Sequence, residues 1–295
     1  MYKISVPATT ANIGPGFDSF GLALKMYNHF TICSSQKLDF ENCKIKKWED
    51  NLVYTSAMKV FETYYDSKNH PKGMYIKFDT TIPFSRGLGS SATCIVAGVV
   101  GANLLLGQPY SDDDLFKMAV DIEGHPDNIA PAFFGGLNIT SKQNNAVLRK
   151  KVEVSSTYSF YLIIPSFRLS TNNSRFVLPD NISLQDATTN ISNATLLILS
   201  LIDGDSKMLK SISADTLHEP YRKVLIPGYD EIKKNALKHG ALGCFLSGAG
   251  PSIFCIVEDR NRFVEGMLPS IKQLDNNWTL KHLGVDYEGV TYTNI

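Results

Sequence analysis

The sequence carries no excess of either charge, because 29 lysines and arginines balance 29 aspartates and glutamates. This balance argues against a protein that binds nucleic acid or a membrane surface through a basic patch. No apolar run reaches the length of about 18 residues that a membrane-spanning helix needs. Residues Met1–Pro7 also lack the apolar core of a signal peptide. We therefore expect a cytoplasmic protein with no nucleic-acid and no membrane partner.

Metal-binding and disulfide patterns are also missing. The five cysteines are scattered and form no Cys-x-x-Cys pair, and the six histidines show no His-x-x-x-His or His-Glu-x-x-His spacing. These absences argue against a zinc site and a disulfide framework, and free thiols fit a reducing compartment. We interpret His29, His70, His218 and His239 as structural or surface residues. The chain contains no Gly-Lys pair, which excludes a Walker phosphate loop.

What is present is enough apolar material for a large core, at 43% of 295 residues, in two domains or one large domain. Strand-like and helix-like segments alternate in both halves. The pattern restarts after the polar turn at 141–145, which predicts a domain boundary dividing 1–154 from 155–295. Strands are expected at 1–6, 27–34, 74–82, 137–140 and 159–164. Helices are expected at 52–65, 90–106, 112–123, 128–134, 184–203, 206–213 and 229–239.

The most informative segment is Pro-Phe-Ser-Arg-Gly-Leu-Gly-Ser-Ser-Ala at 83–92. It follows a predicted strand and opens a helix of small residues. Gly87 and Gly89 allow a close approach of the backbone, and the serines offer hydroxyls and a helix cap. The first N–H groups of a helix have no partner within the helix and favour negative charge. The segment therefore indicates a phosphate-binding site.

A dinucleotide-binding fingerprint is the alternative interpretation of this segment. Gly87–Ala92 fits the pattern Gly-x-Gly-x-x-Ala, and the aspartates at 112–114 lie about 20 residues further on. Those aspartates follow Ser111 and precede Leu115, which is typical of the start of a helix rather than the end of a strand. A dinucleotide site is therefore the weaker hypothesis.

Three further segments gather polar groups in unusual settings. Residues 7–21 form a loop rich in Gly and Pro that contains Asn12 and Asp18, and 246–252 is a glycine turn between two apolar runs. Residues 123–128 end a helix with Glu-Gly-His-Pro-Asp-Asn, where Glu123 and a serine hydroxyl could share Mg²⁺. Taken singly, each has an ordinary structural explanation as a compact loop, a helix end or a tight turn.

In this order, the segments resemble the signature motifs of the GHMP kinase superfamily (galacto-, homoserine, mevalonate and phosphomevalonate kinases). The matching segments are Pro7–Leu24, residues 83–92 and Leu246–Phe254. The stretches at 123–131, 217–222 and 225–228 are most similar to the homoserine kinase family. The resemblance implies an α+β fold of two domains. The N-terminal domain would resemble domain 2 of ribosomal protein S5, and the C-terminal domain would be ferredoxin-like. It also implies transfer of phosphate from ATP to the hydroxyl of L-homoserine, in threonine biosynthesis.

The resemblance also implies roles for individual residues. The implied ATP-binding residues are Asn51, Pro83, Arg86, Gly87, Leu88, Gly89, Ser90 and Ser91. Mg²⁺ would be held by Ser91 and Glu123, which are the implied catalytic residues together with Asn128. The implied homoserine-binding residues are Asn12, Asp18, His125, Thr171, Arg175, Arg222 and Gly248. The two arginines suit a carboxylate, and Asp18 suits an ammonium group.

Several alternatives stay open. The resemblance also implies that Asn128 stands at the position where sugar and mevalonate kinases of the superfamily use an Asp as a base. If so, no side chain of this chain need act as a strong base. Asp127 is the rival base, and we expect it to face away and cap the following helix. Only Gly124 separates Glu123 from His125, where some family members carry a longer insert. Another GHMP kinase or a non-catalytic nucleotide sensor is the alternative function, and a homodimer is the family-level expectation.

Overall fold

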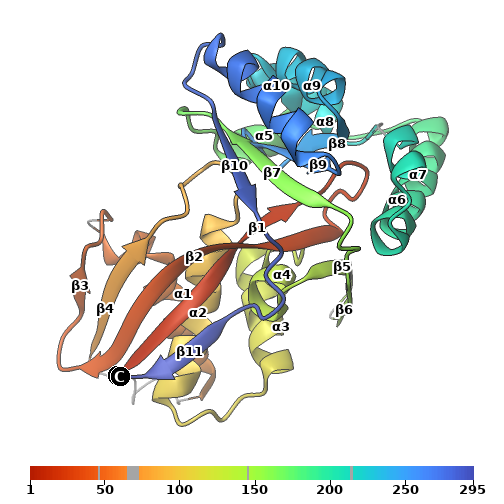
Figure 1. Ribbon diagram of the computed structural model, residues 1–295. Coiled ribbons are helices and arrows are strands. Elements are labelled where there is room, and N and C mark those ends of the chain that lie inside the picture. The colour runs from red at the N-terminus through yellow and green to blue at the C-terminus, as the bar shows by residue number, and fades with distance from the viewer. Residues whose placement is uncertain (46, 65–72, 145, 213–214) are drawn as a thin grey trace.

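The computed structural model describes residues 1–45, 47–64, 73–144, 146–212 and 215–295. They form two β-sheets flanked by helices, and the C-terminus lies at an edge of the first sheet (Figure 1). The first sheet follows the path β11-β1-β2-β4-β3, with β5 paired to β2 and β6 paired to β5. Its strands are β1 (Tyr2–Ala11), β2 (Phe20–Ser35), β3 (Asp39–Glu41), β4 (Gly73–Thr80), β5 (Leu137–Gln143), β6 (Ala146–Val152) and β11 (Thr291–Asn294).

Helices α1 to α4 pack on the first sheet and enclose the first hydrophobic core. Helix α2 is buried along nearly its whole length, because its side chains are small and apolar on every side. Helix α3 begins as the sequence predicts, since the Ser111 side chain accepts a hydrogen bond from the Asp114 N–H in a capping box. The bounds are α1 (Leu52–Tyr64), α2 (Ser90–Leu105), α3 (Asp112–Glu123) and α4 (Ile129–Phe134), with a 3₁₀ turn at Trp48–Asp50.

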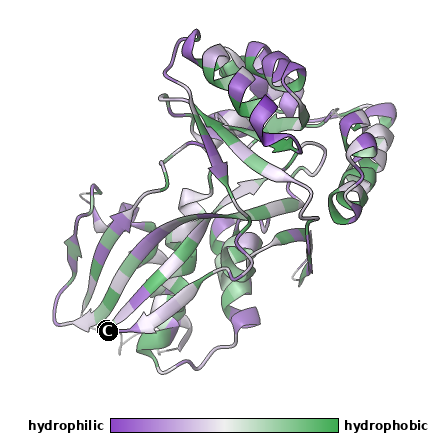
Figure 2. Ribbon diagram, viewed as in Figure 1, coloured by the Kyte–Doolittle hydropathy of each residue, from purple (hydrophilic) through white to green (hydrophobic). Residues whose placement is uncertain are grey.

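The second sheet consists of antiparallel strands in the order β10-β7-β9-β8. In chain order this arrangement is 4-1-3-2, the strand order of the expected ferredoxin-like domain. Helices α9 and α10 pack on one face of it, and their mixed purple and green ribbons contrast with the largely green β7 (Figure 2). The bounds are β7 (Ser159–Ile164), β8 (Ala241–Leu246), β9 (Ile253–Val257), β10 (Thr279–Leu283), α9 (Tyr229–Lys238) and α10 (Arg260–Lys272).

A further hydrophobic core joins the two sheets. Phe160 of β7 stacks on Phe254 of β9 at 5.5 Å, and both belong to one buried cluster with Leu22 and Leu24 of β2. Leu197 and other apolar residues of α6 and α7 complete this cluster. The two halves of the chain therefore share a core. The remaining helices are α5 (Thr171–Phe176), α6 (Leu184–Asp203), α7 (Ser206–Ser211) and α8 (Glu219–Arg222), followed by a 3₁₀ turn at Lys223–Leu225.

The structure corrects two expectations about the N-terminal half. Strand β1 runs on to Ala11 through a bulge between Pro7 and Ala8, so the loop is shorter than the predicted 7–21. Pro at position 7 is tolerated because the strand is irregular there. Strand β2 begins at Phe20 rather than Tyr27, since its first residues are buried on both faces and show no alternation.

The end of the chain was not anticipated from the sequence. Strand β11 pairs with β1, from Tyr2 opposite Asn294 to Ser5 opposite Thr291. A single division at residue 154 therefore assigns this strand to the wrong sheet, although the connection between β6 and β7 does span that point. Strands β3 and β6, helix α10 and strand β10 were also not predicted. The expected helix at 206–213 ends at Ser211, and Ser213 and His70 lie outside the described residues. Across the described residues, no helix is long and apolar enough to span a membrane.

Candidate active site

The four polar segments meet around one cavity of about 480 Å³. Residues from both halves of the chain line it, including the β1–β2 loop, the start of α2, the end of α3 and the loop between β8 and β9. Every predicted site residue except Pro83 is part of the lining. Tertiary structure has thus assembled the predicted set, and the role of each residue stays a prediction.

The glycine loop before α2 is packed closely against the backbone of Ser247 and the side chain of Thr9. Gly87 and Gly89 both have positive φ angles, 72° and 65°. A Cβ atom on Gly87 would lie 2.0 Å from the Ser247 carbonyl oxygen, and one on Gly89 would lie 1.9 Å from Thr9 Oγ1. Only glycine fits at these positions. The Ser90 hydroxyl is buried and has no hydrogen-bond partner among the described residues, so a ligand oxygen can satisfy it.

Ser91 and Glu123 form an oxygen-rich pair beside this loop. The Ser91 hydroxyl donates a hydrogen bond of 2.8 Å to the Glu123 carboxylate. Burial raises the pKa of Glu123 despite that hydrogen bond. No cluster of three metal-ligating side chains exists in the part of the chain that the structure describes. One carboxylate and one hydroxyl suit Mg²⁺, which usually takes few protein ligands and completes its shell with phosphate oxygens and water. The short Glu123–His125 spacing thus leaves the pair intact.

Asn128 is held by a residue that the sequence did not single out. The Thr9 hydroxyl donates a 2.7 Å hydrogen bond to Asn128 Oδ1. Asp127 is buried but lines the cavity instead of facing away. Its Oδ1 accepts from the Asn128 N–H at 3.0 Å and lies 2.8 Å from His125 Nδ1. The expectation that Asp127 caps α4 is therefore wrong. Asn128 occupies the N-cap position of this helix, and no side-chain hydrogen bond caps it.

The charge of Asp127 also affects His125. Burial by itself lowers the pKa of His125, but the hydrogen bond and the charge of Asp127, together with Glu123, raise it above the ordinary value overall. The charge of Asp127 thus favours the protonated form of the His125 imidazole, and both residues line the cavity beside the glycine loop.

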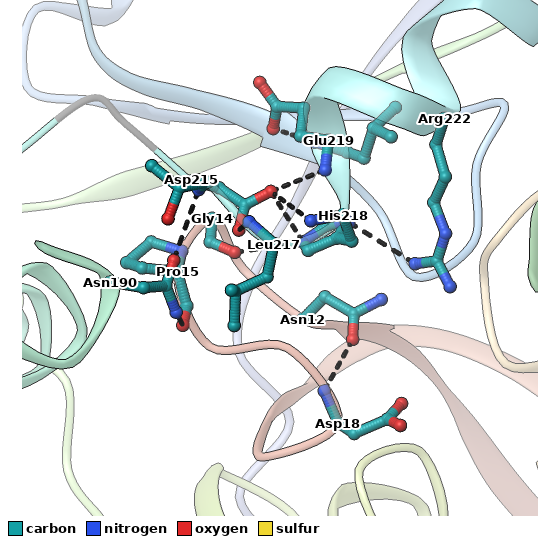
Figure 3. A network of polar contacts seen from close by, with 12 residues as sticks. Asn12, Gly14, Pro15, Asp18, Asn190, Asp215, Leu217, His218, Glu219 and Arg222 are labelled. Atoms are coloured by element: carbon teal, nitrogen blue, oxygen red, sulfur yellow. Dashed lines mark hydrogen bonds and ion pairs between the residues drawn. The ribbon is translucent and has the colours of Figure 1, made fainter. Parts of the chain in front are cut away.

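Two of the predicted substrate-binding residues pair with each other. Arg175 on α5 donates to both carboxylate oxygens of Asp18, at 2.8 and 3.3 Å. Both side chains are about one-third exposed, at 38% and 34%, so the pair remains open to a competing ligand. Asn12 makes its hydrogen bonds to backbone groups rather than to either guanidinium. Its Oδ1 accepts from the Asp18 N–H and its Nδ2 donates to the Gly248 carbonyl, so it holds the loop in place (Figure 3).

Arg222 is the largest fully buried side chain, at 1% exposure. Its Nε donates to the Ser174 carbonyl, and its Nη1 lies 3.3 Å from His218 Nδ1 and 3.4 Å from the Gly248 carbonyl. Burial, with the charge of Arg175, lowers the pKa of Arg222 to about 10, so it stays cationic at neutral pH. The protein itself thus uses Nε and Nη1 of the guanidinium, whereas Nη2 makes no hydrogen bond within the described part of the chain and Arg222 lines the cavity.

Two predicted ATP-binding residues also have structural partners. Asn51 Oδ1 accepts from the N–H groups of Val53 and Tyr54 and so caps α1. Arg86 donates from Nε to the Pro165 carbonyl at 2.9 Å and from Nη2 to the Ser166 carbonyl. Arg86 therefore ties the glycine loop to the second sheet, a role that could not be read from the motif.

Sequence reasoning missed Thr9, Phe17, Asp215 and the polar contacts of His218. Thr9 lies in a strand that was predicted to be loop, and Phe17 looked like an ordinary apolar residue. His218 was interpreted as structural or surface, and it is fully buried. Two signals were available: His218 lies within the family-like stretch 217–222, and it stands four residues before Arg222, which puts both on one side of a helical turn.

Comparison with known proteins agrees with this geometry. The family model described as "GHMP kinases N terminal domain" matches residues 51–136, and "GHMP kinases C terminal" matches residues 198–268. Homoserine kinases of two Clostridium botulinum strains are 44% and 41% identical to the chain. They come from strain Eklund 17B and strain ATCC 19397, and cover 98% and 100% of this chain and 97% and 99% of their own lengths.

A crystal structure of homoserine kinase from Cytophaga hutchinsonii ATCC 33406 superposes with a TM-score of 0.87. It is 30% identical and covers 99% of this chain and 96% of its own. The agreement confirms the expected two-domain α+β fold. Since the family models match both halves and the relatives match nearly the whole length, the chain belongs to the GHMP kinases and, among them, to the homoserine kinase family.

Proposed function

We propose that this protein transfers the γ-phosphoryl group of ATP to the side-chain hydroxyl of L-homoserine, giving O-phospho-L-homoserine and ADP. The observation that carries the proposal is one cavity that combines a phosphate-type loop with groups for a zwitterion. Arg175 and Arg222 offer N–H groups to a carboxylate, and Asp18 offers acceptors to an ammonium group. Asp18 and Arg175 form an ion pair with each other. A zwitterionic ligand can separate them, because its ammonium group can pair with Asp18 and its carboxylate with Arg175.

The nucleotide is proposed to bind with its phosphates against Gly87–Ser91 and the N-terminal end of α2. That end presents backbone N–H groups and the unpartnered Ser90 hydroxyl. Mg²⁺ would be held by Ser91 and Glu123, where it would offset the charge of the phosphates. Glu123 must be ionised to bind Mg²⁺. Burial raises the pKa of its carboxyl group, and a nearby cation would favour the ionised form.

Transfer is proposed to need positioning rather than a strong base. Asn128 lies beside the glycine loop, and its amide is oriented by Thr9. Asp127 is the rival base, but its Oδ1 is engaged by His125 and the Asn128 N–H. A loose phosphoryl-transfer transition state depends mainly on alignment and charge stabilisation.

An ADP-release assay against a panel of hydroxyl compounds tests the proposal. The panel holds L-homoserine, L-serine, mevalonate and galactose, each with MgATP. Turnover should be highest with L-homoserine and should fall strongly in Glu123→Ala, which loses the metal carboxylate. Activity highest with mevalonate or galactose would assign another GHMP kinase. No turnover, with ATP binding seen by calorimetry, would assign a nucleotide sensor.

We also propose a cytoplasmic homodimer. Free cysteines and the balanced charge fit a cytoplasmic enzyme. Light scattering during size-exclusion chromatography measures the mass directly. A mass near that of one 32.7 kDa chain would contradict the dimer.

A further inference from the structure

Arg222 is an unusual buried cation, because the protein surrounds it with neutral acceptors. Its partners are two backbone carbonyls, of Ser174 and Gly248, and the ring of His218. No carboxylate in the described part of the chain lies within ion-pairing distance of it. A buried charge without a counter-ion is costly, and an anionic ligand that enters the cavity removes this cost. The direction of the guanidinium then decides how well it meets that anion.

The ring of His218 has one tautomer that fits its surroundings. Its Nε2 lies 3.0 Å from the Gly14 carbonyl oxygen and 3.5 Å from Asp215 Oδ2, and both of these are acceptors. Nε2 must therefore carry the hydrogen. The other nitrogen, Nδ1, is left as an acceptor and faces Arg222 Nη1 at 3.3 Å (Figure 3). A hydrogen on Nδ1 would point at another donor, so the neutral Nε2–H form alone satisfies all three neighbours.

Asp215 keeps His218 in this place. Its carboxylate accepts hydrogen bonds from the N–H groups of Leu217, His218 and Glu219, which open α8. The start of the helix is thereby fixed (Figure 3), and with it the position of His218 one helical turn before Arg222. Asp215 is itself buried.

Phe17 connects the same histidine to the β1–β2 loop, which carries Asp18. Its ring stacks on His218 with centroids 5.2 Å apart and an interplanar angle of 24°. The Arg222 guanidinium carbon lies 5.1 Å from the centre of that ring. Phe17 directly precedes Asp18, and Gly14, the acceptor of Nε2, belongs to the same loop. The loop that presents Asp18 is thus joined through His218 to the cation on α8.

We propose that His218 is a positioning residue for substrate recognition. As the Nε2–H tautomer it anchors the loop through Gly14 and holds Nη1 of Arg222, which aims Nη2 at the substrate carboxylate. This inference rests on the proposed function in taking homoserine as the carboxylate ligand. It assigns His218 no contact with the substrate and no part in phosphoryl transfer.

Two substitutions separate the contacts of the ring. His218→Gln places an amide nitrogen near Nε2, which keeps the Gly14 contact and loses the acceptor for Arg222. His218→Asn places an amide oxygen near Nδ1, which keeps that acceptor and loses the Gly14 contact. Both variants lose the stacking with Phe17, so they are matched in that respect. Steady-state kinetics with L-homoserine and ATP, after native melting is confirmed, gives KM and kcat for each.

We expect His218→Gln to raise the KM for homoserine by about tenfold or more, as for a lost hydrogen bond to a charged group. His218→Asn loses the Gly14 contact between neutral groups and should raise the KM for homoserine clearly less, by about two- to fivefold. The kcat and the KM for ATP should change little in either variant. Equal effects of the two variants, or a change confined to kcat, would overturn the assignment.

A spectroscopic test does not depend on activity. Long-range ¹H–¹⁵N correlation spectra of labelled protein at neutral pH report which ring nitrogen carries the hydrogen, and His218→Asn assigns the signal. We expect the Nε2–H tautomer, and an Nδ1–H or charged ring contradicts the inference. If wild type shows this tautomer but does not phosphorylate homoserine, the proposed function fails while the buried contact remains.

Discussion

At the scale of single residues, two arginines that look alike in the sequence have different environments. Arg175 is partly exposed and has a carboxylate partner in Asp18. Arg222 is buried and has only neutral partners. Exposed ion pairs contribute little because water screens them, whereas a buried cation interacts strongly with whatever anion reaches it. We therefore expect Arg222 to dominate recognition of the carboxylate.

Arg222→Lys tests this expectation, with Arg175→Lys as its matched partner. Lysine keeps the charge but cannot reach the Ser174 carbonyl and the cavity together, so the KM for homoserine should rise. Loss of a charge-assisted hydrogen bond costs roughly 1.5–3 kcal/mol, or about 10- to 150-fold. Arg175→Lys should cost about fivefold or less, as for an exposed pair. A rise in the KM for ATP in Arg222→Lys would move that residue to the nucleotide site.

The mechanism makes a second prediction at this scale. If Asp127 is not a base, Asp127→Asn should keep kcat within roughly tenfold, well short of the 10²–10⁴-fold that general base catalysis contributes. Asn128→Ala should lower kcat more, because it removes the amide that Thr9 orients beside the glycine loop. The measurements are kcat and pH–rate profiles of both folded variants. A thousandfold loss in Asp127→Asn, with loss of the acidic limb, would make Asp127 the base.

The burial of His218 predicts a pH dependence of stability. Burial lowers the pKa of His218, Arg222 lowers it further, and Asp215 and Glu219 oppose the shift. The unfolded chain then takes up the proton first as the pH falls. The contribution of His218 to the free energy of unfolding is thus complete above the ordinary histidine pKa of about 6.5, and it is lost progressively as the pH falls below that value. Denaturant unfolding from pH 8 to 5 should show a shallower acid loss in His218→Asn than in wild type. Parallel curves would contradict this.

At the scale of elements, the junction of the glycine loop with α2 depends on tertiary packing. The loop meets the Ser247 carbonyl on one side and Thr9 on the other. A partly buried hydrogen bond from Ser247 Oγ to the Gly87 carbonyl adds to this contact. The N-terminal end of α2 is thereby fixed towards the cavity.

Gly87→Ala and Gly107→Ala separate strain from contact. Both positions have positive φ, 72° and 81°, but a Cβ on Gly107 would meet nothing within 4 Å. Gly107→Ala should cost about 1–2 kcal/mol of unfolding free energy and leave the KM for ATP unchanged. Gly87→Ala should lower the unfolding free energy clearly more and should also raise the KM for ATP, because the loop or the backbone at Ser247 must move to admit the Cβ atom. Equal losses of stability in the two variants would show that the Ser247 contact is unimportant.

At the scale of the whole molecule, the two ends of the chain meet in one sheet. Strand β11 covers the edge of β1, whose other end leads directly into the β1–β2 loop that carries Asn12 and Asp18. An uncovered edge offers unpaired N–H and C=O groups to other chains.

Deletion of residues 291–295 should therefore lower the unfolding free energy by about 1 kcal/mol for each ladder hydrogen bond lost. It should also increase self-association at high concentration. Thermal unfolding and light scattering of the shortened and full chains measure the two effects. An unchanged melting temperature would mean that β11 contributes no stability.

The sequence by itself determined the family and the expected chemistry, and it named many of the residues that line the cavity. The glycines and serines at 87–91 were readable because they depend on local residue types and their spacing. Ser91 with Glu123 and the two arginines were named through the resemblance to the family, and their roles stay predictions. Long periodic segments such as α2 and α6 were also readable. The confirmed fold followed from the resemblance of ordered motifs rather than from periodicity, which does not specify strand order.

Tertiary structure alone decided the partners of these residues. Thr9 contacts Asn128 across 119 positions, Arg86 reaches Pro165 across 79, and His218 meets Gly14 across 204. Contacts between residues so far apart leave no local pattern, because they depend on how two sheets close around one cavity. The same reason explains why β11 was not predicted. Its residues are exposed and show no alternation, and pairing with the edge of β1 places it in the sheet.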